Sequence, residues 1–199
     1  WAEAIVPVRP GANVLSTTQH RIREKSFLRG ISIPTTPFET TSDGLKNLGL
    51  PFVFKTAGFG YDGKGQKKIS TDAERADWLQ QNAGTEWIAE KFVDFEKEFS
   101  VIGVRSHSGE VVLYDAIENR HANHILDVSF SPAALPHEAN VIAKRYVSEI
   151  LEKLNVVGVL CVEFFLTLSQ KVLVNELAPR PHNSGHLTIE ASFTSQFEQ

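Results

Sequence analysis

The chain has 199 residues, which is enough for one large domain or two closely packed lobes. Lys and Arg total 20 while Asp and Glu total 24, and the resulting formal charge of −4 argues against a nucleic-acid-binding protein. The single cysteine, Cys161, excludes an internal disulfide and a multi-cysteine zinc site, and the lack of a signal pattern or of an apolar run of about 18 residues predicts a cytoplasmic protein without a membrane partner.

Residues 1–14 are extended and rich in proline, which predicts a linker or the end of a preceding domain. Apolar periodicity and turn residues predict these elements in chain order: a helix over 17–28, a strand over 51–55, a helix over 71–82, a strand over 87–93, a hairpin of 99–104 with 111–116, a helix over 138–154, and a hairpin of 157–167 with 171–177. Thr71 and Glu74 have the spacing of a helix capping box. Antiparallel hairpins covered by a few helices predict an α+β fold.

A glycine-rich, basic segment follows the first predicted strand. Four of the 13 glycines lie at positions 58, 60, 63 and 65, and four nearby lysines with one aspartate give a local charge of +3. Accessible N–H groups and lysines suit such a segment to polyphosphate. Residues 67–70 predict a second strand, which disfavours a dinucleotide fingerprint because a helix would follow directly there, and there is no P-loop motif. We interpret the segment as a phosphate-binding lid; an ordinary glycine-rich turn is the alternative.

Two glutamates are expected to face each other in the last hairpin. If Ser169 and Gln170 form a two-residue turn, Glu163 on one strand pairs with Glu176 on the next. Facing carboxylates repel each other, and a divalent cation would relieve the repulsion. Carboxylates combined with substrate phosphates suit Mg²⁺ or Mn²⁺, and Asn175 is a further candidate ligand. The alternative is a register slip that turns one glutamate to solvent.

The polar run that follows Glu176 contains two prolines and many hydrogen-bond donors. Arg180 could bind an anion through two parallel hydrogen bonds. His182, Asn183 and Ser184 could form a small oxyanion pocket beside it. A solvated loop with incidental polarity is the alternative, although the position directly after the candidate metal ligands favours a binding role.

These motifs resemble the ATP-grasp superfamily, and most closely the N5-carboxyaminoimidazole ribonucleotide synthase family. The resemblance rests on four segments, which are Gln19–Lys25, Gly60–Gln66, Ala89–Val93 with Glu98, and Asn175–His186. The run Pro-Arg-Pro-His-Asn-Ser-Gly-His in the last segment is the most specific of these. Members of the family are longer, so the chain is expected to be the central ATP-grasp portion of such an enzyme.

The resemblance implies an α+β fold whose two lobes, expected over 15–89 and 90–199, enclose ATP. It implies that ATP phosphorylates bicarbonate to carboxyphosphate, which then carboxylates 5-aminoimidazole ribonucleotide in purine biosynthesis, with Mg²⁺ or Mn²⁺ as the metal. All partners would be small molecules, and a homodimer is expected. Two alternatives are another ATP-grasp ligase or carboxylase and a nucleotide-binding module without turnover.

The resemblance also implies site residues. Those expected to bind ATP are Arg21 and Lys55 at the phosphates, Gly60, Tyr61, Asp62, Gly63, Lys64, Gly65 and Gln66 in the lid, Glu90, Lys91, Phe92 and Val93 at adenine, Glu98 at the ribose, and His121, Asn175 and Glu176 nearby. The metal ligands would be Glu163 and Glu176. Tyr61, Asp62 and Lys64 would also meet the ribonucleotide, and the catalytic residues that hold bicarbonate and carboxyphosphate would be Arg180, His182, Asn183 and Ser184.

Overall fold

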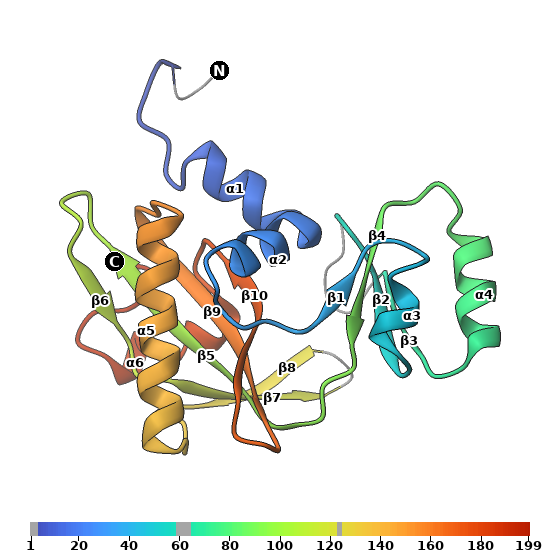
Figure 1. Ribbon diagram of the computed structural model, residues 1–199. Helices are drawn as coiled ribbons and strands as arrows, with labels where there is room; N and C mark the ends of the chain where they lie inside the picture. Colours follow the sequence, from blue (N-terminus) through green and yellow to red (C-terminus); the bar gives the residue numbers. More distant parts are fainter. Residues whose placement is uncertain (1–3, 59–64, 123–124) are drawn as a thin grey trace.

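Figure 1 shows a computed structural model that describes residues 4–58, 65–122 and 125–199. The strands form a four-stranded sheet and a six-stranded sheet, both antiparallel, with helices packed against them. The α+β class predicted from the sequence is therefore confirmed. No helix within the described ranges is long and apolar enough to cross a membrane.

The smaller sheet has the strand order β1–β4–β2–β3. Its elements are β1 (Phe38–Glu39), α3 (Leu45–Leu48), β2 (Phe52–Thr56), β3 (Gln66–Ile69), α4 (Asp72–Gln81) and β4 (Trp87–Lys91). The ring of Phe54 stacks on Trp78 with centroids 3.8 Å apart, and Trp87 meets Phe54 edge to face. The predicted capping box is present, because the Glu74 N–H donates to Thr71 Oγ1 and the Thr71 N–H donates to the Glu74 carboxylate. These contacts fix α4 against the sheet that carries Lys55.

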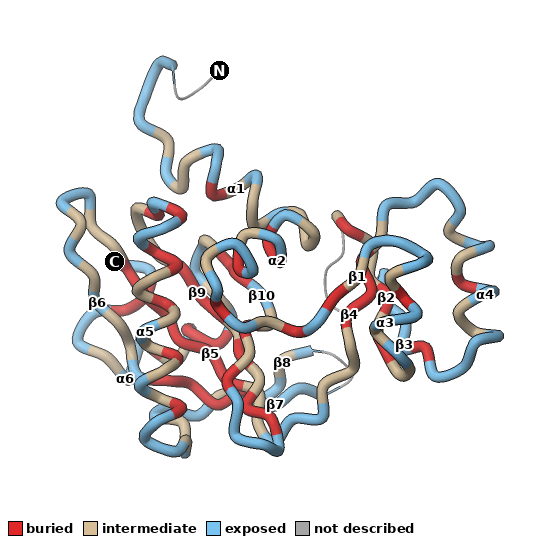
Figure 2. Tube along the Cα trace, in the orientation of Figure 1, coloured by how far each residue is buried: buried red, intermediate tan, exposed pale blue. Residues whose placement is uncertain are grey.

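The larger sheet has the strand order β10–β9–β5–β7–β8, and β6 pairs with β5. Its strands are β5 (Phe95–Arg105), β6 (Val111–Leu113), β7 (Ile117–Ala122), β8 (Ile125–Phe130), β9 (Gly158–Thr167) and β10 (Val172–Ala178), and its long helix is α5 (His137–Lys153). On β9, Val162 and Phe164 belong to the core that contains the apolar face of α5, and Figure 2 shows this buried layer. Because side chains alternate along a strand, Cys161 and Glu163 lie on the opposite face.

The predicted helix over 17–28 is two helices, α1 (Ala12–Thr18) and α2 (Arg21–Gly30). The chain breaks between them because His20 is extended, with φ −139° and ψ 109°. The predicted linker over 1–14 is therefore wrong at its end, where α1 begins. Val14 and Leu28 are buried in the same core as α5 and the larger sheet.

The register of the β9–β10 hairpin is set by a three-residue turn and a bulge, and not by the predicted two-residue turn. The Thr167 N–H donates to the Lys171 carbonyl, so the turn contains three residues, and Gln170 adopts a φ of 61°. A bulge at Asn175 then shifts the register by one residue. After the bulge, Glu176 pairs with Glu163, so the predicted opposition is confirmed although the turn is not.

Short elements near the end of the chain were not predicted. They are the 3₁₀ turn η2 (Asn183–Gly185) and the helix α6 (Thr188–Ala191). Gly185 packs closely here, because a Cβ at this position would displace the ends of the Ile102 and Gln196 side chains. The turn therefore lies directly against the larger sheet and places the polar run beside Glu163.

Candidate functional site

The paired glutamates of β9 and β10 differ in their surroundings. The Glu163 carboxylate is 3.0 Å from His182 Nε2 and accepts a long hydrogen bond of 3.5 Å from Asn175 Nδ2, whereas Glu176 is exposed to solvent. Burial would raise the pKa of Glu163, but the hydrogen bond and charge of His182 outweigh it and lower that pKa. Although part of Glu176 reaches solvent, the protein around its carboxylate reduces its hydration, and this dehydration together with repulsion from Glu163 raises the pKa of Glu176. His182 therefore favours the charged form of Glu163, whereas its surroundings and the facing Glu163 disfavour the charged form of Glu176.

These donors fit a hard divalent cation. Two carboxylates and the Asn175 amide supply oxygen ligands, which Mg²⁺ and Mn²⁺ prefer. Within the residues that the structure describes, no group of three or more His, Cys, Asp or Glu side chains could hold a metal by itself. A cation here would need further ligands from phosphate oxygens, as is common for Mg²⁺ in phosphoryl-transfer enzymes.

A buried chain of polar side chains supports His182 from behind. The Ser184 hydroxyl shares hydrogen bonds with His182 Nδ1 at 2.9 Å and with Ser100 Oγ at 2.8 Å, and Asn119 Nδ2 donates to Ser100 Oγ at 3.1 Å. Ser184 has no exposed surface, so its side chain orients His182. The expectation that Ser184 contacts a ligand is therefore wrong. Burial opposes the charge of His182, but Cys161 and Glu163 favour it and raise the pKa of His182 to about 10.

Arg180 and Asn183 are exposed beside these hydrogen-bonded polar side chains. The Arg180 guanidinium donates to the carbonyl of Pro181 at 2.9 Å and contacts no carboxylate that the structure describes. Together with protonated His182, Arg180 supplies positive charge next to the glutamate pair. This arrangement is suited to an anion that lies close to a metal.

The smaller sheet places the expected phosphate residues around a buried carboxylate. Lys55 Nζ lies 3.1 Å from Glu90 Oε2, and Lys25 Nζ lies 3.5 Å from the same oxygen. Arg21 donates to the Thr56 carbonyl at 2.8 Å, which holds its guanidinium near the end of β2. Burial would raise the pKa of Glu90, but Lys25 and Lys55 outweigh it and lower that pKa.

The four residues expected at adenine lie at the end of β4. The Glu90 side chain is buried against the lysines, and Lys91 Nζ donates to the carbonyls of Gly49 and Leu50. The Phe92 ring receives Lys68 Nζ at 3.6 Å from its centroid, and Val93 is half-buried. The side chains of Glu90 and Lys91 therefore bind protein, and contact with adenine stays a prediction.

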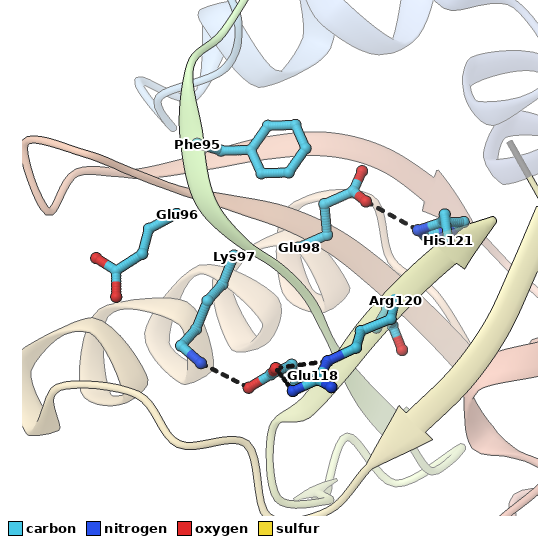
Figure 3. Close-up of a pocket in the computed structure, with 8 residues that line it drawn as sticks. Phe95, Glu96, Lys97, Glu98, Glu118, Arg120 and His121 are labelled. Carbon is cyan, nitrogen blue, oxygen red and sulfur yellow. Dashed lines mark hydrogen bonds and ion pairs between the residues drawn. The ribbon is translucent and has the colours of Figure 1, made fainter. Parts of the chain in front are cut away.

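Glu98 and His121 line a pocket of about 430 Å³ between β5 and β7 (Figure 3). Glu98 Oε2 lies 2.9 Å from His121 Nδ1, and this hydrogen bond outweighs burial to raise the pKa of His121. At the other end of the pocket, Glu118 pairs with Lys97 at 2.7 Å and with Arg120 at 3.2 Å. The pocket brings together two expected nucleotide contacts, and the glutamate pair does not line it.

Most of the glycine-rich lid falls outside the described residues: Gly60, Tyr61, Asp62, Gly63 and Lys64. The residues that flank it are described. The Thr56 N–H donates to the Gly65 carbonyl at 2.9 Å, and Gln66 pairs with Lys55 as β3 begins. The predicted second strand after the lid is confirmed.

Sequence reasoning missed several residues that support the site. Glu24 and Lys25 are 3% and 1% exposed, and both contact β10. Adjacent charged residues on a helix normally point to solvent, so the sequence contains no signal for their burial. The sequence also contains no signal for Ser100 and Asn119, because isolated polar residues within strands are common.

Comparison with known proteins agrees with this geometry. The model of the ATP-grasp domain matches residues 27–197. The chain is 42% identical over 207 residues to an N5-carboxyaminoimidazole ribonucleotide synthase of Bacillus subtilis, covering 100% of this chain and 54% of that protein. It therefore spans about half the length of the curated N5-carboxyaminoimidazole ribonucleotide synthases that it matches.

Solved structures are also similar. An ADP complex of an N5-carboxyaminoimidazole ribonucleotide synthetase superposes with a TM-score of 0.94 at 39% identity, covering 100% of this chain and 54% of that one. The synthase of Aspergillus clavatus in complex with ADP and 5-aminoimidazole ribonucleotide gives 0.88 at 26% identity, covering 99% and 54%. With a family model that matches most of its length, the chain belongs to the ATP-grasp family.

Proposed function

We propose that the chain is the ATP-grasp portion of an N5-carboxyaminoimidazole ribonucleotide synthase. This enzyme uses ATP and bicarbonate to carboxylate 5-aminoimidazole ribonucleotide in purine biosynthesis. The observation that carries the proposal is the register that pairs Glu163 with Glu176 and is followed directly by Arg180 and His182. A facing carboxylate pair beside two cationic side chains suits a metal-bound polyphosphate and a small anion at the same time.

Each group has a role in this proposal. Lys55 and Arg21 bind the phosphates of ATP, and Glu163 and Glu176 hold Mg²⁺ or Mn²⁺ with Asn175 beside them. When bound, the metal neutralises charge on the phosphate oxygens. Bicarbonate oxygen attacks the γ-phosphorus and releases ADP, and the amine of the ribonucleotide then attacks the carboxyl carbon of carboxyphosphate and releases phosphate.

The polar run orients the small anion. Arg180, His182 and Asn183 hold bicarbonate and carboxyphosphate, and the protonated imidazole of His182 compensates part of their charge. Ser184 acts behind them, because its hydroxyl fixes the ring of His182. Exclusion of water by the lid would protect carboxyphosphate from hydrolysis.

The remaining assignments follow the family. The lid, from Gly60 to Gln66, closes on the phosphates, and within it Tyr61, Asp62 and Lys64 contact the ribonucleotide. Adenine lies against Glu90–Val93, with Glu98 at the ribose and His121 close by. The whole protein would be a cytoplasmic homodimer that binds only these small molecules.

Phosphate release by the full-length protein encoded by the gene tests this function. We expect release from ATP that requires both bicarbonate and 5-aminoimidazole ribonucleotide, and a strong loss in Arg180→Ala. Arg145→Ala, on the exposed surface of α5, is the matched control and should leave the rate unchanged. Turnover that depends on another acceptor would indicate a different ATP-grasp ligase, and nucleotide binding without turnover would indicate a binding module.

A further inference from the structure

Two adjacent charged residues of α2 are buried against the edge of the larger sheet. β10 is the terminal strand of that sheet, and α2 lies beside it in Figure 1. An edge strand has backbone groups without a strand partner on one side. Glu24 and Lys25 are 3% and 1% exposed, although charged side chains are almost never fully buried unless they are paired. Their burial therefore calls for a specific role.

Both side chains bind the backbone on either side of Glu176. Glu24 Oε2 accepts from the Leu177 N–H at 3.0 Å, and Lys25 Nζ donates to the Asn175 carbonyl at 2.8 Å. These two groups belong to the two peptide units that join at the Cα of Glu176. Asn175 is also the bulged residue, whose insertion brings Glu176 opposite Glu163. The α2 pair thus holds the backbone where the register is set.

Lys25 also reaches the other sheet. Its Nζ lies 3.5 Å from Glu90 Oε2, and the same oxygen lies 3.1 Å from Lys55 Nζ. Thr35 Oγ1 accepts a further hydrogen bond from Lys25 Nζ at 2.8 Å. One buried ammonium therefore connects the strand that carries Glu176 with the carboxylate that holds Lys55.

We propose that Glu24 and Lys25 are positioning residues that hold the Glu176 carboxylate in register with Glu163 and tie it to Lys55. The inference rests on the proposed function, because it takes Glu176 as a metal ligand and Lys55 as a phosphate ligand. Neither α2 side chain has the exposed surface to contact a ligand itself. Outer residues that orient metal ligands typically change metal affinity or activity by about 10–100-fold.

Binding of Mn²⁺ in the presence of ADP, measured by electron paramagnetic resonance, tests this positioning without turnover. We expect Lys25→Met to weaken Mn²⁺ binding by about 10-fold or more, since the Asn175 carbonyl loses its donor. Glu24→Leu should weaken Mn²⁺ binding as well, because it cannot accept from the Leu177 N–H, whereas Glu24→Gln should restore the affinity because its amide oxygen can still accept. Leu28→Ala is the matched control, as it removes a fully buried side chain of the same helix that contacts no site residue through a hydrogen bond. It should lower the unfolding temperature but leave Mn²⁺ affinity unchanged.

Lys25→Arg keeps the measurement decisive if Lys25→Met does not fold. The variant preserves the charge, but a planar guanidinium cannot reproduce the contacts of a compact ammonium. Weaker Mn²⁺ binding in folded Lys25→Arg or Lys25→Met supports the proposal, and wild-type affinity in the folded Lys25 variants overturns it. If the wild type binds Mn²⁺ with ADP but does not carboxylate 5-aminoimidazole ribonucleotide, the proposed function fails while the positioning test stands. Absence of Mn²⁺ binding in the wild type overturns the metal assignment and the positioning role with it.

Discussion

Two groups of acidic side chains lie on the two sheets, and they differ in charge balance. In the smaller sheet, the buried Glu90 carboxylate lies within 3.5 Å of two lysine ammonium groups. In the larger sheet, Glu163 faces Glu176, and His182 is the cation paired with Glu163. A buried carboxylate that is paired with cations is destabilising to lose, because its partners are left without compensation, whereas two facing carboxylates are tolerated where a ligand of opposite charge completes the site. This difference is consistent with the proposal that Glu90 positions Lys55 and that the glutamate pair binds a ligand.

Removing the charge of Glu176 should give the largest effect on activity. We expect Glu176→Gln to lower ATP turnover by at least about 10²-fold, because the metal and the phosphates lose their alignment. The metal-free variant should unfold at the same temperature as the wild type or slightly higher, since repulsion from Glu163 is relieved. Phosphate release and thermal unfolding in a chelator measure the two effects. Full turnover, or a clear loss of stability, would contradict the ligand-binding role.

The same change at Glu90 should act mainly on stability. Glu90→Gln leaves the buried ammonium of Lys25 without its carboxylate, and loss of one partner of a buried ion pair costs about 3 kcal/mol of unfolding free energy. Chemical denaturation of the two glutamine variants, side by side, makes the contrast quantitative. If Glu90→Gln were as stable as Glu176→Gln, the ion pairs of Glu90 would not stabilise the folded protein, and the proposed difference between the two groups would be wrong.

The fold followed from local patterns where one face of an element is apolar. The long helix α5 and the strand β9 were predicted because their buried faces repeat at helical and strand spacing. β7 and β8 were not, because β7 carries Glu118, Asn119 and Arg120 in succession and its alternation is lost. Two compensating irregularities in the last hairpin, the three-residue turn and the bulge at Asn175, also left no separate signal in the sequence.

The residues that we propose to carry the chemistry were easier to find in the sequence than those that contact them from behind. Glu163, Glu176 and Arg180 stand out because charges beside apolar strands are unusual. Ser184 was expected at the ligand, yet it is fully buried, and only the three-dimensional packing of η2 against Ser100 reveals its position. Supporting roles depend on contacts between segments far apart in the sequence, which local spacing does not encode.

Ser184→Ala tests one such supporting role and should have a moderate effect. The variant removes the hydroxyl that binds His182 Nδ1, and we expect ATP turnover to fall by about 10-fold as the ring loses its orientation. The unfolding free energy should fall by about 2 kcal/mol, because the hydroxyl also binds Ser100 Oγ and each hydrogen bond usually contributes about 1 kcal/mol. Ser26→Ala, on the exposed face of α2, is the control for both measurements. A loss of stability without a loss of turnover would restrict Ser184 to packing.

Glu118 gives the smallest expected effect, because it is paired with two cations, Lys97 and Arg120, but lines a pocket. The hydrogen bond from Lys97 lowers the pKa of Glu118 despite opposing burial, and Arg120 adds to it. A carboxylate with a lowered pKa stabilises the fold at a pH above its ordinary pKa of 4.5, and this stabilisation is lost as the pH falls through the lower, folded-state pKa.

We therefore expect Glu118→Gln to reduce stability slightly at pH 7 and to flatten the decline of stability below pH 4.5. Thermal unfolding between pH 7 and pH 3 measures this, with Glu152→Gln on the exposed face of α5 as the control. Solvent near the pocket screens these pairs, so the change should be much smaller than that of Glu90→Gln. An equal or larger effect would mean that ion pairing, rather than burial, determines how strongly these balanced groups stabilise the protein.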